Sequence, residues 1–423
     1  MRQAIDNTAR KLNKLDIYHS PISVYIDKAN PTDPSTTPTD LAIYFSAREK
    51  SRYTIRTGTE VGHADGSAFA SASLRNIFGG AESLNVHLSK GTRTRSAFSA
   101  VFDTPILSDP DFRFELGGLS SATLKPWASC EEVLRGFTPK LKYTTPSGHL
   151  HTLSYSGMWR TITGLSPNAS NAVRVDAGDS FKSSITHTWL TEQRDYPLLP
   201  SRGYMAKVTT ELAGVGPLKG DVAFLKSEAD TQAALPLPVP GLASASTSGV
   251  ALTTSLRAGL LYPLAAAGQP RPQPSRINDR FVLGGPADVR GFKAAGLGPH
   301  DGGDALGGDV YAAGSLALTL PFPRVGVDAP LRLRVFANAG RLVALRARGR
   351  ADVEGWSADG VRDAVVEAVR KVADGWPSAA AGFGVVCAHP MARVELNFSL
   401  PLVIRKGEET RKGLSLGIGI DFM

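Results

Sequence analysis

Short segments in which apolar and polar residues alternate run through most of this chain, and they restrict its fold more than any other feature. The clearest are residues 331–336, 393–400 and 413–422, where every second residue is apolar. Period two with one apolar face is the pattern of a half-buried β-strand. The positions between the apolar residues include Arg332, Arg334, Arg393 and Glu395. Charge on this second face indicates a wet interior and argues against a soluble two-sheet sandwich, which needs an apolar core.

The alternating segments and the turns between them predict about sixteen strands of roughly 8–14 residues, the range of an outer-membrane barrel. Their expected starts are residues 52, 66, 82, 94, 111, 134, 149, 181, 203, 220, 250, 305, 331, 379, 391 and 412. We therefore predict an all-β fold, an antiparallel transmembrane β-barrel. No window of about 18 apolar residues exists, so the sequence predicts no membrane-spanning helix. A barrel needs only alternating segments and leaves mean hydropathy near neutral, here −0.09.

Two segments have helical periodicity instead. Apolar residues recur at a helical spacing in residues 5–15, and two strand-like segments follow at residues 17–27 and 41–48. Residues 357–373 carry an apolar stripe opposite charged residues, which predicts an amphipathic helix. This helix could lie on a membrane surface or cap the barrel mouth, and packing against the barrel is the favoured interpretation. The first residues lack an apolar signal segment, which favours an organelle outer membrane or a trimmed N-terminus.

Composition and motifs exclude several function classes. The net charge of +8 fits nucleic acid, anionic lipid or a basic pore lining. No basic run with interleaved aromatic residues occurs, so we expect no nucleic-acid partner. Neither HExxH, GxSxG nor a Cys/His ligand spacing is present. His149 and His151 fit a polar strand face, and Asp301, Asp304 and Asp309 lack the EF-hand spacing. We expect no catalytic residue, metal or cofactor, and no enzyme activity.

The Gly-rich stretch Arg280–Pro299 contains one cation between apolar neighbours, in the order Val289, Arg290, Gly291 and Phe292. Glycine permits close-packed backbone that Cβ atoms would block. One interpretation is a surface hairpin. The other is a loop that places Arg290 in an enclosed polar space and Phe292 against a wall. A phosphate-binding loop is excluded, because no Gly-Lys-Ser/Thr follows and no helix pattern begins there.

The sequence LGGPADVRGF, followed by LGG and a strand-like segment, resembles the loop-six signature of the outer-membrane assembly and translocation superfamily. That superfamily includes the bacterial β-barrel assembly factor and its mitochondrial sorting-and-assembly counterpart, whose core subunits this chain resembles over nearly its whole length. The resemblance implies a transmembrane barrel at residues 51–423, with loop six folded inward at about residues 265–304. It also implies that residues 1–50 are a partial polypeptide-transport-associated (POTRA) domain.

The resemblance also assigns a contact for Arg290. Family members place this arginine in the lumen against a strand motif of Phe, x, Asp, x, Gly, which here matches Phe336, Asn338 and Gly340. The alternation puts these three residues on the lumen face. Asparagine replaces the usual acid, so we expect a weaker contact with Arg290 than a charge-assisted one. Asp309 is a candidate for the missing charge.

The first and last strands would form the seam of the barrel. The first, Arg52–Gly62, has modest apolar content, and Tyr53, Ile55, Thr57 and Thr59 are candidates for pairing with a foreign strand. The last strand resembles the C-terminal β-signal of mitochondrial barrel proteins. Its matching residues are Ser415, Gly417, Ile420 and Phe422. Simple closure of the protein's own barrel is the plainer explanation of that strand.

The resemblance implies that the protein inserts and folds β-barrel precursors in the mitochondrial outer membrane, through a lateral gate between first and last strands. The implied partners are precursor proteins, accessory subunits and outer-membrane lipid, with the N-terminal domain in the intermembrane space. A polypeptide-translocating pore of the same superfamily, in secretion or in a plastid envelope, is the alternative. A plain metabolite channel is less favoured, because it has no reason to keep the loop around Arg290.

Overall fold

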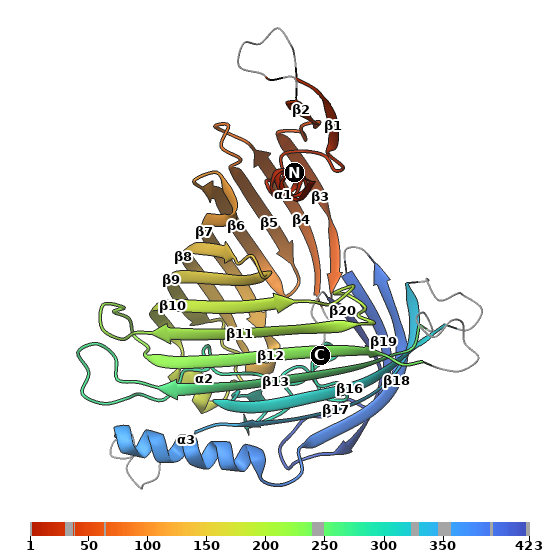
Figure 1. Ribbon diagram of the computed structural model, residues 1–423. Helices are drawn as coiled ribbons and strands as arrows, with labels where there is room; N and C mark the ends of the chain where they lie inside the picture. Colours follow the sequence, from red (N-terminus) through yellow and green to blue (C-terminus); the bar gives the residue numbers. More distant parts are fainter. Residues whose placement is uncertain are drawn as a thin grey trace.

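A single antiparallel sheet of sixteen strands dominates the computed structural model. The structure describes residues 2–29, 37, 39–62, 65–238, 249–322, 330–345, 357–389 and 392–419. Each strand of this sheet pairs with its neighbour in the chain, and the sheet curls into a barrel-like wall (Figure 1). The predicted fold class, a barrel of about sixteen antiparallel strands, is confirmed.

The sixteen strands follow the predicted order closely. They are β3 (Tyr53–Gly62), β4 (Asp65–Arg75), β5 (Ser83–Gly91), β6 (Thr94–Ile106), β7 (Asp109–Lys125), β8 (Cys130–Thr144), β9 (His149–Thr163), β10 (Gly178–Glu192), β11 (Gly203–Ala213), β12 (Phe224–Pro236), β13 (Ala251–Pro263), β16 (Val310–Pro321), β17 (Leu331–Val343), β18 (Ser378–His389), β19 (Ala392–Val403) and β20 (Gly413–Gly419). The largest difference is at β16, which was predicted to start near residue 305. The Gly-rich residues before Val310 instead form a small hairpin of β14 (His300–Asp301) and β15 (Asp304–Ala305).

Apolar side chains cover the outer face of the wall and polar ones line the inner face. Large apolar residues are exposed on many strands, among them Leu256, Leu316, Val335, Phe383 and Leu396. On β17 and β19 the alternate positions point inward and are buried, including Arg334 and Glu395. Alternating apolar-out and polar-in strands are the arrangement of a transmembrane barrel.

The two ends of the sheet are β3 and β20. Strand β3 pairs with β4, and β20 pairs with β19. Within the described residues, which stop at residue 419 and omit 63–64, no ladder of hydrogen bonds joins β3 to β20. The edges of both strands therefore meet at an open seam in this part of the chain (Figure 1).

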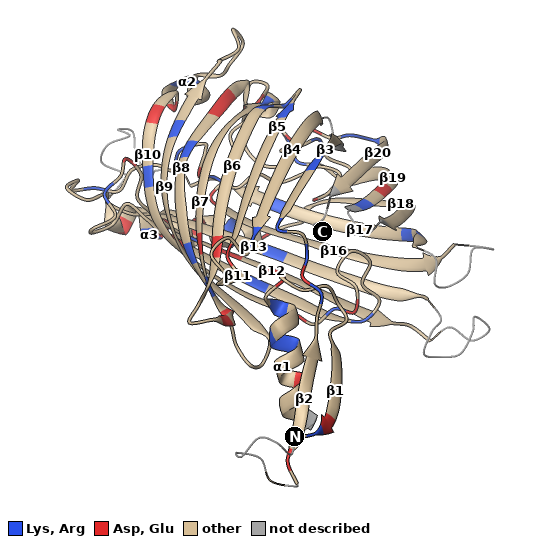
Figure 2. Ribbon diagram, turned by 90° about the horizontal axis from the view of Figure 1, so that it is seen from above, with Lys and Arg blue, Asp and Glu red and all other residues tan. Residues whose placement is uncertain are grey.

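A small N-terminal unit precedes the sheet. It contains α1 (Arg2–Lys14) and a hairpin of β1 (Ser23–Lys28) and β2 (Leu41–Ser46). Figure 2 shows these elements together at one end of the barrel, where Lys14 forms an ion pair with Asp111 of β7 at 2.6 Å. Strand β1 starts later than the predicted residue 17, since Tyr18 makes only an isolated bridge and Pro21 has no N–H for a ladder.

Loop six, here residues 264–309 between β13 and β16, is folded against the inner face of the wall. Its apolar residues Phe281, Leu283, Val289, Phe292 and Leu297 are buried. They form one core with inward side chains of the surrounding strands, namely Ala213, Phe224, Leu261, Tyr311, Ala313, Leu342 and Ala380. The loop is therefore packed against the inner face of β11–β13 and β16–β18.

The predicted amphipathic helix is α3 (Ala358–Ala373), capped by Ser357, whose hydroxyl accepts from the Gly360 N–H. Its apolar stripe packs against Val310, Leu345 and side chains of β13 and β17. The β13 contacts, Leu260 and Tyr262, flank the inward-facing Leu261, so α3 lies on the outer side of the wall. Packing against the barrel is thus confirmed. Across the described residues, every helix is too short or too polar to span a bilayer.

Candidate functional site

The tip of loop six carries Arg290 into the inner wall because the flanking backbone can approach that wall closely. Gly291 has a φ of +88°, and a Cβ there would lie 2.7 Å from the Ala380 Cβ. Positive φ and this lack of space both require glycine. Val289 and Phe292 on either side are buried in the inner core. The structure thus selects the enclosed loop over the surface hairpin.

The guanidinium of Arg290 pairs with Glu395 of β19. Its Nε and Nη2 donate to the same carboxylate oxygen, Oε2, at 3.0 and 2.8 Å. Both side chains have 0% exposure to solvent. An ion pair without water is strong only when its other hydrogen-bonding atoms are also satisfied.

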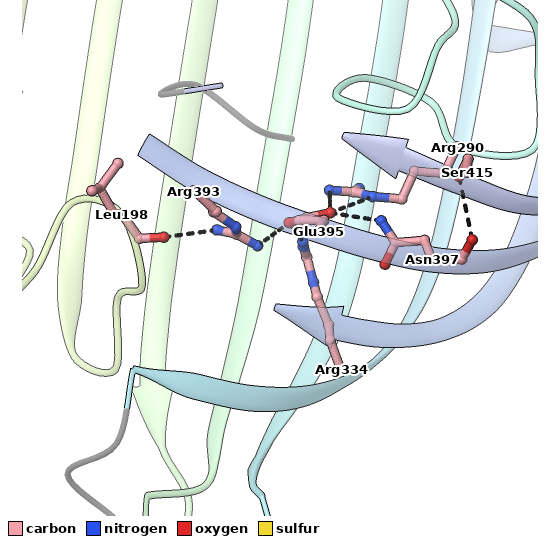
Figure 3. A network of polar contacts seen from close by, with 7 residues as sticks. All are labelled: Leu198, Arg290, Arg334, Arg393, Glu395, Asn397 and Ser415. Carbon is pink, nitrogen blue, oxygen red and sulfur yellow. Dashed lines mark hydrogen bonds and ion pairs between the residues drawn. The ribbon is translucent and has the colours of Figure 1, made fainter. Parts of the chain in front are cut away.

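Glu395 collects further donors from three residues (Figure 3). Oε1 accepts from Arg334 Nη1 of β17 at 2.7 Å and from Arg393 Nη2 of its own strand. Oε2 also accepts from Asn397 Nδ2 at 2.8 Å. Three guanidinium groups therefore converge on one carboxylate, and this cluster ties loop six to β17 and β19.

A turn between β10 and β11 extends the cluster toward one end of the barrel. Arg393 Nη1 donates to the Leu198 carbonyl at 3.1 Å (Figure 3). Within this turn, burial raises the pKa of Asp195, but hydrogen bonds from Ser201 and the Arg202 backbone outweigh it and hold the pKa below its usual value. The ionised carboxylate therefore orders the turn that presents Leu198 to the cluster.

The predicted motif on β17 lies on the inner face and contacts loop six through three different interactions. The Phe336 ring lies 5.2 Å from Arg290 Cζ, a cation–π contact. A Cβ at Gly340 would lie 2.8 Å from Leu283 Cδ2, so glycine leaves the space that the loop fills. With the Asn338 amide oriented to satisfy its neighbours, its oxygen accepts from the Arg290 N–H at 2.7 Å and its nitrogen donates to the Arg290 carbonyl at 3.3 Å.

These contacts correct one expectation about the charge near Arg290. Glu395, not Asp309, pairs with the guanidinium. Asp309 instead accepts hydrogen bonds from Ser275 and from the Leu345 N–H, so it holds the base of loop six. Asn338 binds the backbone of Arg290, through hydrogen bonds that are not charge-assisted. An amide fits that position since it both donates and accepts.

Further polar contacts hold the tip of loop six. Arg257 of β13 donates to Asp288 at 3.1 Å, and Lys293 pairs with Glu409 at 3.3 Å. A cavity of about 610 Å³ separates the tip from the turns on the other side of the bore. Its lining includes Arg93, Trp127, Pro286, Phe292, Arg411 and Ser415. Because Ser415 of β20 is one of the lining residues, the cavity reaches a strand that borders the seam.

The backbone of β3 faces the seam at the residues predicted for strand pairing. The Arg75 N–H donates to the Arg52 carbonyl, which makes Arg52 and Arg75 a hydrogen-bonded pair. Hydrogen-bonded and non-bonded pairs alternate along an antiparallel ladder, and the register of β3 and β4 is regular. Tyr53, Ile55, Thr57 and Thr59 are then non-bonded positions. Their N–H and C=O groups point away from β4, toward the open edge.

The predicted closing strand is described in part. Ser415 and Gly417 lie on the buried face of β20, and Ser415 Oγ donates to the Asn397 carbonyl at 3.4 Å. Ile420 and Phe422 lie outside the described residues. His151 and His187 stack on neighbouring strands, but no group of three metal-ligating side chains occurs in the described part of the chain.

A sixteen-stranded antiparallel wall with an apolar outer face and an arginine loop held in its bore defines the class of outer-membrane assembly and translocation barrels. The chain belongs to the Omp85 superfamily, whose domain model matches residues 76–422.

Curated relatives match almost all of the chain. A SAM50-like protein of Schizosaccharomyces pombe is 36% identical over 421 residues, covering 99% of this chain and 82% of that protein. The sorting and assembly machinery component 50 homologue of Homo sapiens is 33% identical, covering 98% of this chain and 81% of that protein.

Solved structures share the fold at low sequence identity. BamA from Haemophilus ducreyi, lacking POTRA domains 1–3, has a TM-score of 0.71 and 14% identity, covering 98% of this chain and 78% of that one. CdiB from Acinetobacter baumannii has a TM-score of 0.54 and 12% identity, covering 96% of this chain and 66% of that one.

Proposed function

We propose that this protein inserts and folds β-barrel precursors into the mitochondrial outer membrane, using the free edge of β3 as a template. The observation that carries the proposal is the backbone of Tyr53, Ile55, Thr57 and Thr59, whose N–H and C=O groups face a seam without a ladder in the described residues. Unpaired strand edges accept other strands through main-chain hydrogen bonds. The names of the relatives, which denote sorting and assembly machinery, support the same role.

In the proposed mechanism the terminal strand of a precursor adds to β3 and extends the sheet. Main-chain pairing accepts many sequences, because the hydrogen bonds involve no side chains. Outward-pointing Tyr53 and Ile55 are 71% and 73% exposed, so they can pack against alternate side chains of the added strand. The seam between β3 and β20 then acts as a lateral gate, with Ser415 and Gly417 on its other strand.

The arginine cluster steadies the last strands while the seam is open. Glu395 and Asn397 lie on β19, the strand that pairs with β20. Glu395 pairs with Arg290 and Arg334 and thereby fixes β19 to loop six and β17, and Asn397 donates to the same carboxylate. One side of the gate is therefore held by buried polar contacts, and β3 is free to exchange partners.

The N-terminal unit is proposed to be a partial POTRA domain in the intermembrane space, at residues 1–50. Its helix contacts the β6–β7 end of the barrel through Lys11, Lys14 and their acidic partners Asp109 and Asp111. A precursor arriving from that side would meet the start of β3 first. Accessory subunits and outer-membrane lipid are the further partners we propose.

A polypeptide-translocating pore of the same superfamily is the second candidate, since a cavity of about 610 Å³ lies beside the tip of loop six. An open pore needs a clear bore. Here Val289 and Phe292 of loop six are buried against the inner wall, and the side chain of Arg290 has 0% exposure. This filling favours assembly at the seam over passage through the lumen.

Reconstitution tests the proposal directly. The 423-residue chain is placed in vesicles of phosphatidylcholine, phosphatidylethanolamine and phosphatidylinositol, and a urea-unfolded barrel precursor is added. We expect faster formation of protease-resistant, heat-modifiable barrel than in empty vesicles, and no gain with Thr57→Pro. Equal rates with and without the protein would refute assembly, and delivery of the precursor into the vesicle interior would establish the pore instead.

A further inference from the structure

Loop six is fixed to two strands that lie far apart along the sheet, β9 and β19. In the order of the sixteen strands, β9 and β19 lie eight steps apart, which is half of the sheet. Arg290 connects the loop to Glu395 on β19. The loop makes a second buried ion pair with β9, and this pair has no counterpart in the proposed assembly mechanism.

The second pair joins Asp279 of the loop to Arg160 of β9. Arg160 Nη1 and Nη2 donate to the two oxygens of Asp279 at 2.6 and 3.3 Å, in a bidentate arrangement. The side chains are 5% and 1% exposed. Lys226 of β12 donates to the Asp279 carbonyl at 2.8 Å and fixes the backbone there. Bidentate arginine–carboxylate pairs hold both partners in a defined orientation.

Between these two ends the loop is packed and not slack. Phe281, Leu283 and Val289 are buried against inward side chains of β11–β18. Arg257 of β13 donates to Asp288 at 3.1 Å, two residues before Arg290. Movement of one end is therefore transmitted to the other through a packed segment of only residues 279–290.

We infer that Arg160 and Asp279 form a second anchor of loop six, so that residues 279–290 are an internal brace held at both ends, by β9 and by β19. The two ion pairs have opposite arrangements of charge. On β9 the wall supplies the cation and the loop the anion, and on β19 the wall supplies the anion. Neither end of the loop can therefore exchange its wall partner for the other one.

The brace gives the sheet a curvature that does not depend on closure. A closed barrel fixes its own cross-section through the ladder between first and last strands. No such ladder joins β3 and β20 within the described residues, and in this inference the connection through loop six sets the spacing of the walls. In this inference Arg160 is a positioning residue that acts on Arg290 through the loop. It concerns the protein's own barrel and does not depend on the assembly role.

Pulsed electron paramagnetic resonance on the whole chain in lipid nanodiscs tests the brace. Spin labels at the outward positions Leu153 of β9 and Leu396 of β19, 49% and 48% exposed, report the spacing of the two walls. Cys130 and Cys387 are first replaced by Ser. Arg160→Gln and Asp279→Asn should each broaden and shift the distance distribution. The reversed pair, Arg160→Asp with Asp279→Arg, should restore the narrow distribution.

Arg113→Gln is the matched control, because Arg113 pairs with Asp103 through Nε and Nη2 between the adjacent strands β7 and β6. It should lower the urea midpoint without changing the β9–β19 distance, which separates bracing from general stability. If Arg160→Gln does not fold, Arg160→Lys keeps the charge but loses the bidentate geometry, and should broaden the distribution partly. An unchanged distribution in Arg160→Lys or Arg160→Gln, or equal broadening in Arg113→Gln, would overturn the inference.

Discussion

The side-chain amide of Asn338 lies against the backbone of Arg290, accepting from its N–H at 2.7 Å and donating to its carbonyl at 3.3 Å. The same amide nitrogen donates to the Ala380 carbonyl at 3.0 Å. One residue of β17 therefore satisfies three backbone groups of loop six and β18. Loop six is held at this point through its main chain as well as through its arginine.

Asn338→Leu should destabilise the barrel by about 1–3 kcal/mol or more, because the replacement leaves buried backbone groups of Arg290 without partners. Asn338→Asp should cost less, since the carboxylate still accepts from the Arg290 N–H. The stability of both variants is measured as the urea concentration at which half of the protein has lost the folded band that shifts on heating in gel electrophoresis. Asn85→Leu on β5, at an exposed position, is the control and should change little. Equal midpoints for Asn338→Leu and wild type would contradict this role.

Glu395→Gln should be the most damaging single change in the arginine cluster. It leaves the guanidinium groups of Arg290, Arg334 and Arg393 buried without their shared carboxylate, at a cost of about 3–5 kcal/mol. Arg334→Met should cost less, because Glu395 keeps two guanidinium partners. Unfolding midpoints of the two variants give the order directly, and a larger loss for Arg334→Met would disprove the shared-carboxylate arrangement.

Thr57→Pro should block precursor folding while leaving the barrel itself intact. Proline is tolerated at an edge strand where the missing N–H faces away from the sheet, as at Thr57. An added strand would lose that hydrogen bond and meet the proline ring, so we expect at least about a tenfold lower folding rate.

Two control variants locate the effect of Thr57→Pro. Thr57→Val keeps the N–H and should retain nearly full activity. Arg56→Pro removes an N–H that faces β4, so it should weaken the protein's own sheet and lower its urea midpoint. Folding rates and midpoints are compared for all three. Equal activity of Thr57→Pro and Thr57→Val would exclude main-chain pairing at this position.

Val365→Asp should release α3 from the outer wall, because it places a carboxylate against the buried cluster with Val310 and Leu345. Trypsin cleavage after Arg370 or Lys371 reports the release. Val366→Asp, at a neighbouring position with 43% exposure, is the control and should leave cleavage slow. Rapid cleavage in both variants, or in neither, would contradict the assigned packing face.

Alternation alone predicted the sheet, because the inner and outer faces of a barrel wall demand opposite polarity at every second residue. Alternation predicted the ends of the strands less accurately. Before β16 the Gly-rich residues carry no periodicity, so the predicted start near residue 305 missed Val310. The N-terminal strand β1 begins later than predicted for another reason, because Tyr18 makes only an isolated bridge and Pro21 has no N–H to donate to a ladder.

The sequence indicated which residues belong to the candidate site, but it did not indicate which of them pair with each other. The alternation of apolar and polar residues placed Glu395 on the inner face, and the family resemblance placed Arg290 in the bore. Nothing in the sequence fixes how far the loop reaches along the bore, so the 105-residue separation of Arg290 and Glu395 hid their contact. The motif on β17 drew attention to Asn338, whose contact is with backbone. A useful signal was available, since Glu395 was the one acid among the inward charges singled out on these strands.

Site-specific disulfide crosslinking at the seam tests the central claim most directly. Single cysteines at Ile55, Thr57 and Thr59 are paired with cysteines along the terminal strand of a precursor during its folding. Antiparallel addition to β3 predicts that each two-residue step along β3 moves the crosslinked precursor position by two residues in the opposite direction. Crosslinks that show no such register, or that form only with bore-lining residues such as Phe292, would mean that precursors do not fold on this edge.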